Sequence, residues 1–198
     1  MPVQRQPIPY FTASLFSPSV HGSIFILLKR YVQTQYDHST WVRLVETSGL
    51  GALDFNHKEV YPDAHIYALV GHAAEMTGIP AEKLQEKFGE YLVPDLMYIY
   101  GKLVDPAWRT LDMIEHTESV MHKRVRQDHA ENRPPVLDVT RVSSQEVQIN
   151  YVSDRRMGAL AVGIVRGLAT YFDEADQIVV EPTTSENGEH VQIRVRRI

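Results

Sequence analysis

The sequence predicts an α+β fold, in which a helical N-terminal part packs on a C-terminal antiparallel sheet that carries one buried helix. Residues 21–130 place apolar side chains at helical spacing almost throughout. Residues 131–198 contain stretches that alternate between apolar and polar residues, as paired strands do. A continuous apolar stretch, 157–172, separates two such pairs. Helices and strands segregated along a chain are typical of α+β proteins.

Size and composition indicate one globular domain. The chain has 198 residues, of which 43% are hydrophobic and 23% charged. A chain of this length buries roughly 70% of the surface exposed by its unfolded form, so it can enclose a core and a pocket. We expect a single domain over 21–198, preceded by an extended or poorly ordered N-terminal extension over 1–20, which contains several prolines and shows no helical period.

Charge and cysteine content exclude several kinds of function. The net charge is −5, which argues against a nucleic-acid-binding domain. The basic residues Arg194, Arg196 and Arg197 are expected on a solvated strand. The chain contains no cysteine, so disulfides, thiolate-bound metals and a cysteine nucleophile are excluded. No apolar run is long enough for a membrane span and no secretory signal is visible, so we expect a cytoplasmic protein.

The helical part divides into several segments. Stretches 22–36 and 38–50 predict the first two helices, and a third begins near Pro62 and stops at Gly78. Residues 81–101 predict two helices that meet near Pro94, because proline normally interrupts a helix. Residues 106–127 predict one long helix.

The C-terminal part predicts two hairpins around a helix. The first hairpin turns near Ser143 and Ser144, and the closing hairpin turns at Asn187-Gly188, a common two-residue turn. In the helix between them, Gly163 and Gly167 form a GxxxG pattern. This pattern allows another element or a flat ligand to approach closely.

One histidine stands out on a helical wheel of the segment 106–127. At about 100° per residue, His122 falls on the arc of the apolar residues, whereas His116 falls on the polar side. Glu115 and Glu118 lie near the apolar arc and are expected to bridge to other elements or to solvent. His122 is therefore either a core imidazole bonded to a carbonyl or a ligand of a metal or cofactor.

The remaining histidines form no metal-binding pattern. No HxxxH or HExxH spacing occurs, which disfavours a zinc enzyme. His21 precedes the first helix and is expected to cap it or to lie on the surface. No hydrolase elbow, Walker motif or dinucleotide fingerprint is present.

The stretch Y-V-S-D-R-R-M, which begins at residue 151, lies between the first hairpin and the buried helix. Tyr151, Ser153 and Arg155 would point to one face of a strand. One interpretation is a strand end at which Ser153 or Asp154 caps the next helix. The other is a clamp for a carboxylate or phosphate, since arginine recognises such groups bidentately.

These features together resemble the H-NOX family, the haem-nitric oxide/oxygen binding domains related to the sensor domain of soluble guanylate cyclase. HGSIFILLKRYV resembles the opening helix of the family, and FGEYLVPDLM resembles its FG-containing helix. LDMIEHTESVMHKRV followed by RPPVL resembles the haem-ligand helix and its proline turn. YVSDRRM contains the family's Y-x-S-x-R motif. The resemblance covers residues 21–198 and implies that haem b lies between the helical part and the sheet.

The resemblance implies roles for individual residues. The family's haem ligand is a histidine about a dozen residues before the proline turn, and His122 stands twelve residues before Pro134. His116 is the alternative ligand. Pro135 matches the proline that presses on the haem and distorts it.

The Y-x-S-x-R motif of the family holds the haem propionates, which would assign that role to Tyr151, Ser153 and Arg155. On this resemblance, Tyr151, Ser153 and Arg155 would bind carboxylates, which agrees with the clamp interpretation.

The resemblance also implies which gas is bound. Oxygen-binding relatives place a tyrosine nine residues after the first tyrosine of the motif, where this chain has Leu160. The neighbouring distal positions match Ile24, Leu28 and Leu92, all apolar. Bound O₂ needs a hydrogen-bond donor, whereas NO does not, so we expect a sensor of NO, which also binds CO. A polar residue that entered the pocket from elsewhere would change this expectation.

The function that follows is a haem-based gas sensor without enzymatic activity. It would signal to a separate protein such as a histidine kinase or a cyclic-dinucleotide enzyme, a partner that the family implies. Two other classes remain open. A haem enzyme or redox protein would need an acid–base group in the distal pocket, and a haem-less interaction domain would need to have lost its ligand.

Overall fold

The computed structural model describes residues 19–51, 54–128, 134–152, 157–184 and 190–198. Of the expected N-terminal extension, residues 1–18 lie outside this range. Its last two residues, Ser19 and Val20, belong to a strand with His21.

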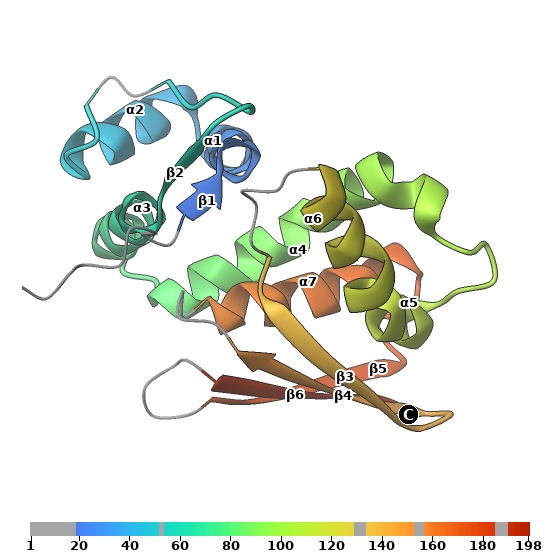
Figure 1. Ribbon diagram of the computed structural model, residues 1–198. Coiled ribbons are helices and arrows are strands. Elements are labelled where there is room, and N and C mark those ends of the chain that lie inside the picture. Colours follow the sequence, from blue (N-terminus) through green and yellow to red (C-terminus); the bar gives the residue numbers. More distant parts are fainter. Residues whose placement is uncertain (1–18, 52–53, 129–133, 153–156, 185–189) are drawn as a thin grey trace, which may run out of the picture.

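The N-terminal part is a group of helices around a small two-stranded sheet (Figure 1). Its elements are β1 (Ser19–His21), α1 (Gly22–Gln35), α2 (His38–Thr47), β2 (Val60–Pro62) and α3 (Asp63–Thr77). His21 caps α1, as the sequence predicts, because its side chain accepts a hydrogen bond from the Ser23 backbone N–H. β1 and β2 pair antiparallel, with Val20 opposite Tyr61.

Aromatic side chains form the core of this part. The ring of Phe25 stacks on that of Phe55 with centroids 4.3 Å apart, and Tyr61 meets Phe55 edge-on at 5.0 Å. Offset and edge-on ring pairs contribute about 0.5–1.5 kcal/mol each beyond the burial of their area. Trp41 of α2 completes the cluster and thereby attaches α2 to α1.

Helix α4 (Ala81–Tyr100) runs without a break through Pro94, so the prediction of two helices meeting there was wrong. Proline removes one helical hydrogen bond, but packing against a neighbour can outweigh that loss. The neighbour is α7 (Gly158–Tyr171), the buried helix. A Cβ added to Gly163 would lie 2.0 Å from the Glu86 carbonyl oxygen, and one added to Gly89 would lie 2.4 Å from that of Leu160. The glycine pattern therefore serves close packing of two helices.

The segment expected as one long helix contains three helical elements. They are the α-helix α5 (Thr110–His116), the π-helix η2 (Thr117–His122) and the α-helix α6 (Lys123–Asp128). A short 3-10 turn, η1 (Gly101–Leu103), precedes them. The start at Thr110 rather than near 106 has a clear cause, since Glu174 accepts the Thr110 backbone N–H at 3.0 Å. Apolar spacing in the sequence does not distinguish a single π turn from α-helix, so the π turn was missed.

The C-terminal part is a four-stranded antiparallel sheet with α7 against one face (Figure 1). The strands are β3 (Val136–Ser143), β4 (Glu146–Val152), β5 (Ile178–Thr184) and β6 (His190–Arg197), in the spatial order β3-β4-β6-β5. Both expected hairpins are present, and the first turns between Ser143 and Glu146. The turn at Asn187-Gly188 lies outside the described residues.

The two faces of this sheet differ in polarity. Val147, Ile149 and Ile193 are almost fully buried under α7. The outer face pairs its charges, with Arg194 bonded to Glu146 and Arg196 to Glu181. The basic C-terminal strand is thus an ion-paired surface.

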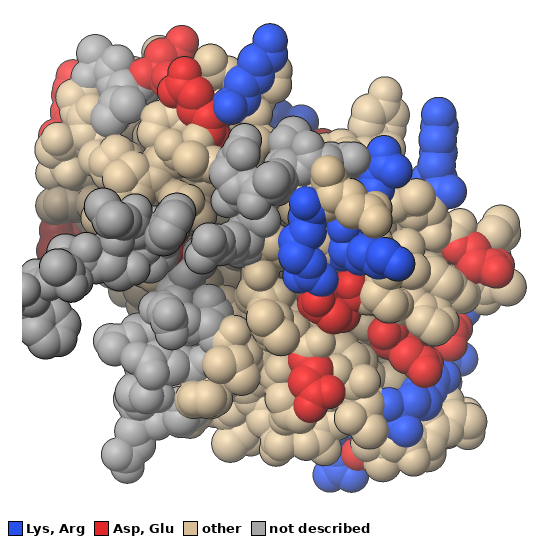
Figure 2. Space-filling model, in the orientation of Figure 1, with Lys and Arg blue, Asp and Glu red and all other residues tan. Residues whose placement is uncertain are grey.

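Acidic and basic side chains intermingle on the face shown in Figure 2, so that face presents no extended area of a single charge. Within the ranges that the structure describes, no helix is both long and apolar enough to cross a membrane.

Candidate functional site

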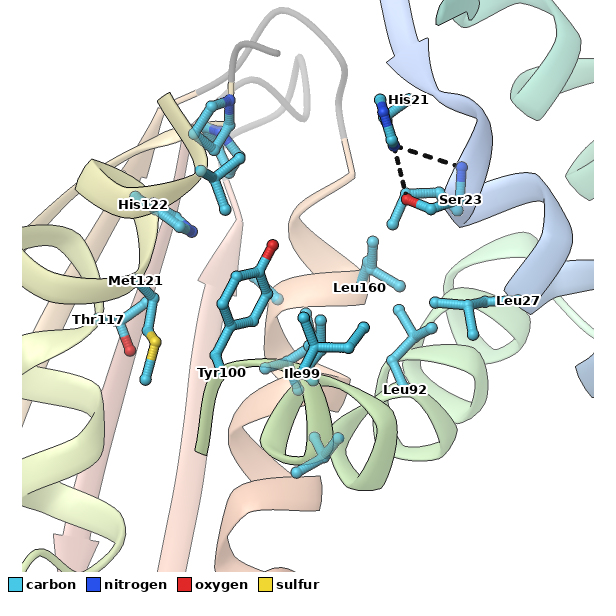
Figure 3. A pocket seen from close by; sticks show the side chains of 18 of the residues that line it. His21, Ser23, Leu27, Leu92, Ile99, Tyr100, Thr117, Met121, His122 and Leu160 are labelled. Atoms are coloured by element: carbon cyan, nitrogen blue, oxygen red, sulfur yellow. Dashed lines mark hydrogen bonds between the residues drawn. The ribbon is translucent and has the colours of Figure 1, made fainter. Parts of the chain in front are cut away.

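A cavity of about 320 Å³ lies where the N-terminal and C-terminal parts meet. Its walls come from α1, α4, α7 and the η2–α6 segment, and most of its lining is apolar (Figure 3). The close packing of α4 on α7 forms its floor. Helices and strands therefore surround a space that no single element could enclose.

The cavity brings together residues that are far apart in the sequence. The site residues expected from the sequence that line it are Ile24, Leu92, His122, Pro135, Tyr151 and Leu160. Tyr151 is only 3% exposed. Ser153 and Arg155, the other members of the Y-x-S-x-R motif, lie outside the described residues. His116 does not line the cavity and instead stacks on Trp108 with ring centroids 4.5 Å apart.

Leu28 does not line this cavity, although the sequence analysis grouped it with Ile24. It lines a separate, smaller cavity of about 60 Å³ that faces α2 and α3. Leu28 packs in the aromatic core with Phe25 and Val32, although Ile24 and Leu28 stand four residues apart, a spacing that places both on one face of a helix. Leu27, three residues after Ile24, occupies the wall of the larger cavity instead.

His122 projects from the end of η2 at one wall of the cavity (Figure 3). Its side chain is 17% exposed, so the prediction of an inward histidine is confirmed. Burial lowers the pKa of the imidazole, and the hydrogen bond to Glu118 and its negative charge only partly offset this. Its ring is thus favoured in the neutral form, which keeps one nitrogen lone pair free for a metal.

Glu118, one helical turn before His122, makes the first of these bonds. Its Oε2 lies 2.8 Å from Nδ1 of His122 and also accepts the backbone N–H of Leu137 at 3.3 Å. Its other oxygen accepts a bond from Arg126. Burial raises the pKa of this carboxyl, but the bonds from Arg126 and His122 outweigh it, so the pKa is held below its usual value. The expectation that Glu118 bridges to another element is confirmed.

The opposite wall includes Leu27, Leu92 and Leu160 (Figure 3), and Ile24 of the same helix as Leu27 also lines the cavity. Two polar residues near the start of α1, His21 and Ser23, also line the cavity. His21 Nδ1 lies 2.7 Å from the Ser23 hydroxyl oxygen. Only apolar residues were predicted on this side. The sequence did not reveal the polar pair, because a histidine that caps a helix gives no sign that it also faces a pocket.

Several further lining residues were not foreseen. Tyr100 at the end of α4 points into the cavity, and Thr117 and Met121 belong to the wall of His122 (Figure 3). Tyr100 could have been found only if α4 had been recognised as continuous through Pro94. The period of η2 differs from that of an α-helix, so a helical wheel could not place Thr117 correctly.

The chemistry of the lining restricts the kind of ligand. Within the described residues, no cluster of three or more histidine, cysteine, aspartate or glutamate side chains could hold a metal ion by itself. One neutral imidazole in an apolar cavity suits a metal whose remaining ligands come from a flat organic macrocycle. The residues present thus fit a haem, which His122 would hold through its ring.

Comparison with known proteins identifies the class. The family model described as haem-NO-binding matches residues 21–180. The chain therefore belongs to the haem-NO-binding, or H-NOX, family, whose fold is that of a haem-binding gas sensor. No curated protein matches the sequence.

Solved H-NOX structures share the fold at low sequence identity. The H-NOX protein from S. oneidensis in its Fe(II)NO state superimposes with a TM-score of 0.82 at 20% identity, covering 90% of this chain and 99% of that one. The Fe(II) unliganded A71G mutant from K. algicida superimposes with a TM-score of 0.81 at 17% identity, covering 90% and 97%. The α+β fold expected from the sequence is confirmed.

Proposed function

We propose that this chain is a haem b sensor of nitric oxide that signals to a separate protein and does not itself catalyse a reaction. The observation that carries the proposal is the position of His122, a neutral imidazole at one wall of an apolar cavity, facing a wall of aliphatic side chains. Haem would supply an iron centre that binds a diatomic gas on the side opposite His122.

Different residues of the cavity would hold different parts of the haem. His122 would ligate the iron, and Pro135 beside it would press on the macrocycle. Tyr151, with Ser153 and Arg155, would hold the propionates. This assignment is supported by Tyr151 lining the same cavity as His122.

The aliphatic wall would set the choice of gas. Ile24, Leu27, Leu92 and Leu160 carry no hydrogen-bond donor, so this part of the wall favours NO or CO over O₂, which takes up negative charge and needs a donor. His21 and Ser23 also line the cavity, and the selectivity for NO requires that this pair keep its mutual hydrogen bond and donate none to the bound gas. The η2–α6 segment, which contains His122 and bonds β3 through Glu118, would carry the signal to a partner such as a histidine kinase or a cyclic-dinucleotide enzyme, whose state a shift of this segment against β3 would bias.

The test is an absorption spectrum of the purified chain reconstituted with haem under anaerobic conditions. We expect a ferrous haem spectrum that changes with NO and with CO and shows no stable O₂ complex in air. His122→Gly should lose haem and regain it with added imidazole, whereas His116→Ala should match the original protein. Absence of haem binding would refute the sensor and favour an interaction domain, and loss of haem in His116→Ala alone would move the ligand to His116.

A haem enzyme is the second candidate, because His21 lines the cavity and forms a hydrogen-bonded pair with Ser23. An imidazole held in this way could act as a general acid or base. Turnover of peroxide by the reconstituted protein that falls at least tenfold in His21→Ala would favour this function. Peroxide turnover no higher than that of free haem would exclude it.

A further inference from the structure

The carboxylate of Glu118 lies at the centre of a polar group beside His122. It accepts bonds from the His122 ring, the Arg126 guanidinium and the Leu137 backbone N–H. The Glu118 side chain is 27% exposed, although it lies beside a mostly apolar cavity. A partly buried carboxylate is costly unless its oxygens are bonded, and both oxygens of Glu118 are.

Backbone geometry brings this group together. Glu118 and His122 lie within the same π-helical segment, four residues apart. Leu137 belongs to β3, so Glu118 also ties the segment to the first strand of the sheet. π-helical turns are rare and occur frequently at functional sites. Here the turn aligns a carboxylate and an imidazole and also anchors them to the sheet.

We propose that Glu118 is a positioning residue for His122, which fixes the orientation and strengthens the donor character of the ring nitrogen that would face the haem. The inference rests on the proposed role of His122 as haem ligand. The Nδ1–H group donates to Glu118, so the lone pair lies on Nε2. A carboxylate that accepts this hydrogen bond raises the basicity of a metal-binding histidine and holds its ring orientation.

Arg126 would moderate this effect. Its guanidinium bonds to the other oxygen of Glu118 and draws negative charge away from His122. Removal of Glu118 and removal of Arg126 should therefore shift the properties of His122 in opposite directions. A merely structural role for the two residues would not produce opposite shifts.

The experiment compares Glu118→Gln, Glu118→Ala and Arg126→Gln in the haem-reconstituted full chain. The control is Glu115→Gln, because Glu115 is a neighbouring carboxylate on the same helical segment that bonds Arg141 and not His122. The readouts are the iron–histidine stretching band, the reduction potential and the rate at which haem transfers to an excess of apomyoglobin.

Glu118→Gln should lower the stretching frequency and make the potential more positive. Arg126→Gln should shift both in the opposite direction, and Glu115→Gln should leave both unchanged. Glu118→Ala should lose haem roughly 10- to 100-fold faster, as is usual when a hydrogen-bond partner of a metal ligand is removed.

Unchanged band and potential in Glu118→Gln, with haem still bound through His122, would overturn this inference and leave the sensor proposal intact. Shifts of equal sign in Glu118→Gln and Arg126→Gln would also overturn it, because both would then report a general loosening of the wall. Failure of the original protein to bind haem, or haem that stays bound in His122→Gly without imidazole, would instead refute the proposed function.

Discussion

The two walls of the cavity differ in the balance of forces that hold them. Where the wall of His122 meets the sheet, polar bonds add to apolar packing: the Leu137 backbone N–H donates to Glu118, and Arg141 pairs with Asp112 and Glu115. The opposite wall depends mainly on shape, through the aromatic core around α1 and the interlocked glycines of α4 and α7, with the ion pair of Arg166 and Glu86 added between the last two helices.

This difference indicates how a single domain can combine a rigid support with an adjustable one. Close packing without gaps tolerates little displacement, since any added atom collides with backbone. Hydrogen bonds and ion pairs can exchange partners, and their strength depends on pH and salt. We therefore expect changes in the packed wall to affect stability most and changes in the polar wall to depend on solution conditions.

The largest change in the free energy of unfolding should come from the closely packed wall formed by α4 and α7. Gly163→Ala would place a Cβ 2.0 Å from the Glu86 carbonyl oxygen, so α4 and α7 would have to separate. We expect a loss of about 3 kcal/mol in the free energy of unfolding, measured by urea titration. Gly71→Ala is the control, because the Cβ added there meets nothing within 4 Å and should stabilise α3 by about 0.5–1 kcal/mol. Equal effects of the two changes would contradict the description of this wall.

A smaller loss in the free energy of unfolding is expected at the start of α5, on the side of the cavity that contains His122. Glu174 accepts the Thr110 backbone N–H and pairs with Arg197, and its side chain is only 8% exposed. Glu174→Gln should lower the free energy of unfolding at pH 7 by about 2 kcal/mol, because hydrogen bonds to charged groups contribute that much. Glu75→Gln, on the exposed side of α3, is the control and should change the free energy of unfolding little.

The same carboxyl predicts a pH dependence. Burial raises its pKa, but the bonds from Thr110 and the charge of Arg197 outweigh this, so the pKa in the folded protein lies below the ordinary 4.5. Its contribution to stability is therefore fully present above that value and disappears as the pH falls through the lower folded pKa. In urea titrations between pH 7 and pH 3, the free energy of unfolding should fall less steeply with pH in Glu174→Gln than in the original protein. An identical pH dependence in the two proteins would show that Glu174 does not contribute to the acid sensitivity.

The smallest effect concerns the surface ion pairs of the polar wall. Arg141 bonds Asp112 and Glu115 at 3.3 Å each, and all three side chains are partly exposed. Arg141→Gln should cost about 0.5 kcal/mol at low salt and almost nothing at 1 M NaCl, because exposed pairs are weak and screened. A loss that persisted at high salt would show that this wall, too, depends on packing.

Much of the cavity was predictable because it follows from helical periodicity and motif order. The inward position of His122 came from the apolar arc of its helix, and Tyr151 and Pro135 came from short motifs around it. Leu28 was placed with Ile24 although the two line different cavities, because residues four positions apart share a helix face and only tertiary packing decides which cavity each one lines. The position of Tyr100 in the cavity was not predicted, because Pro94 was expected to break α4.

By itself, the sequence determined the α+β class, the order of helices and hairpins, and the inward position of His122, because all of these depend on local periodicity. Only the tertiary structure decided that α4 stays continuous, that a π turn carries His122, and that Glu118 bonds its ring. It also decided that His21 and Ser23 enter an otherwise aliphatic wall. These features arise from contacts between segments far apart in the chain, and such contacts can override local preference.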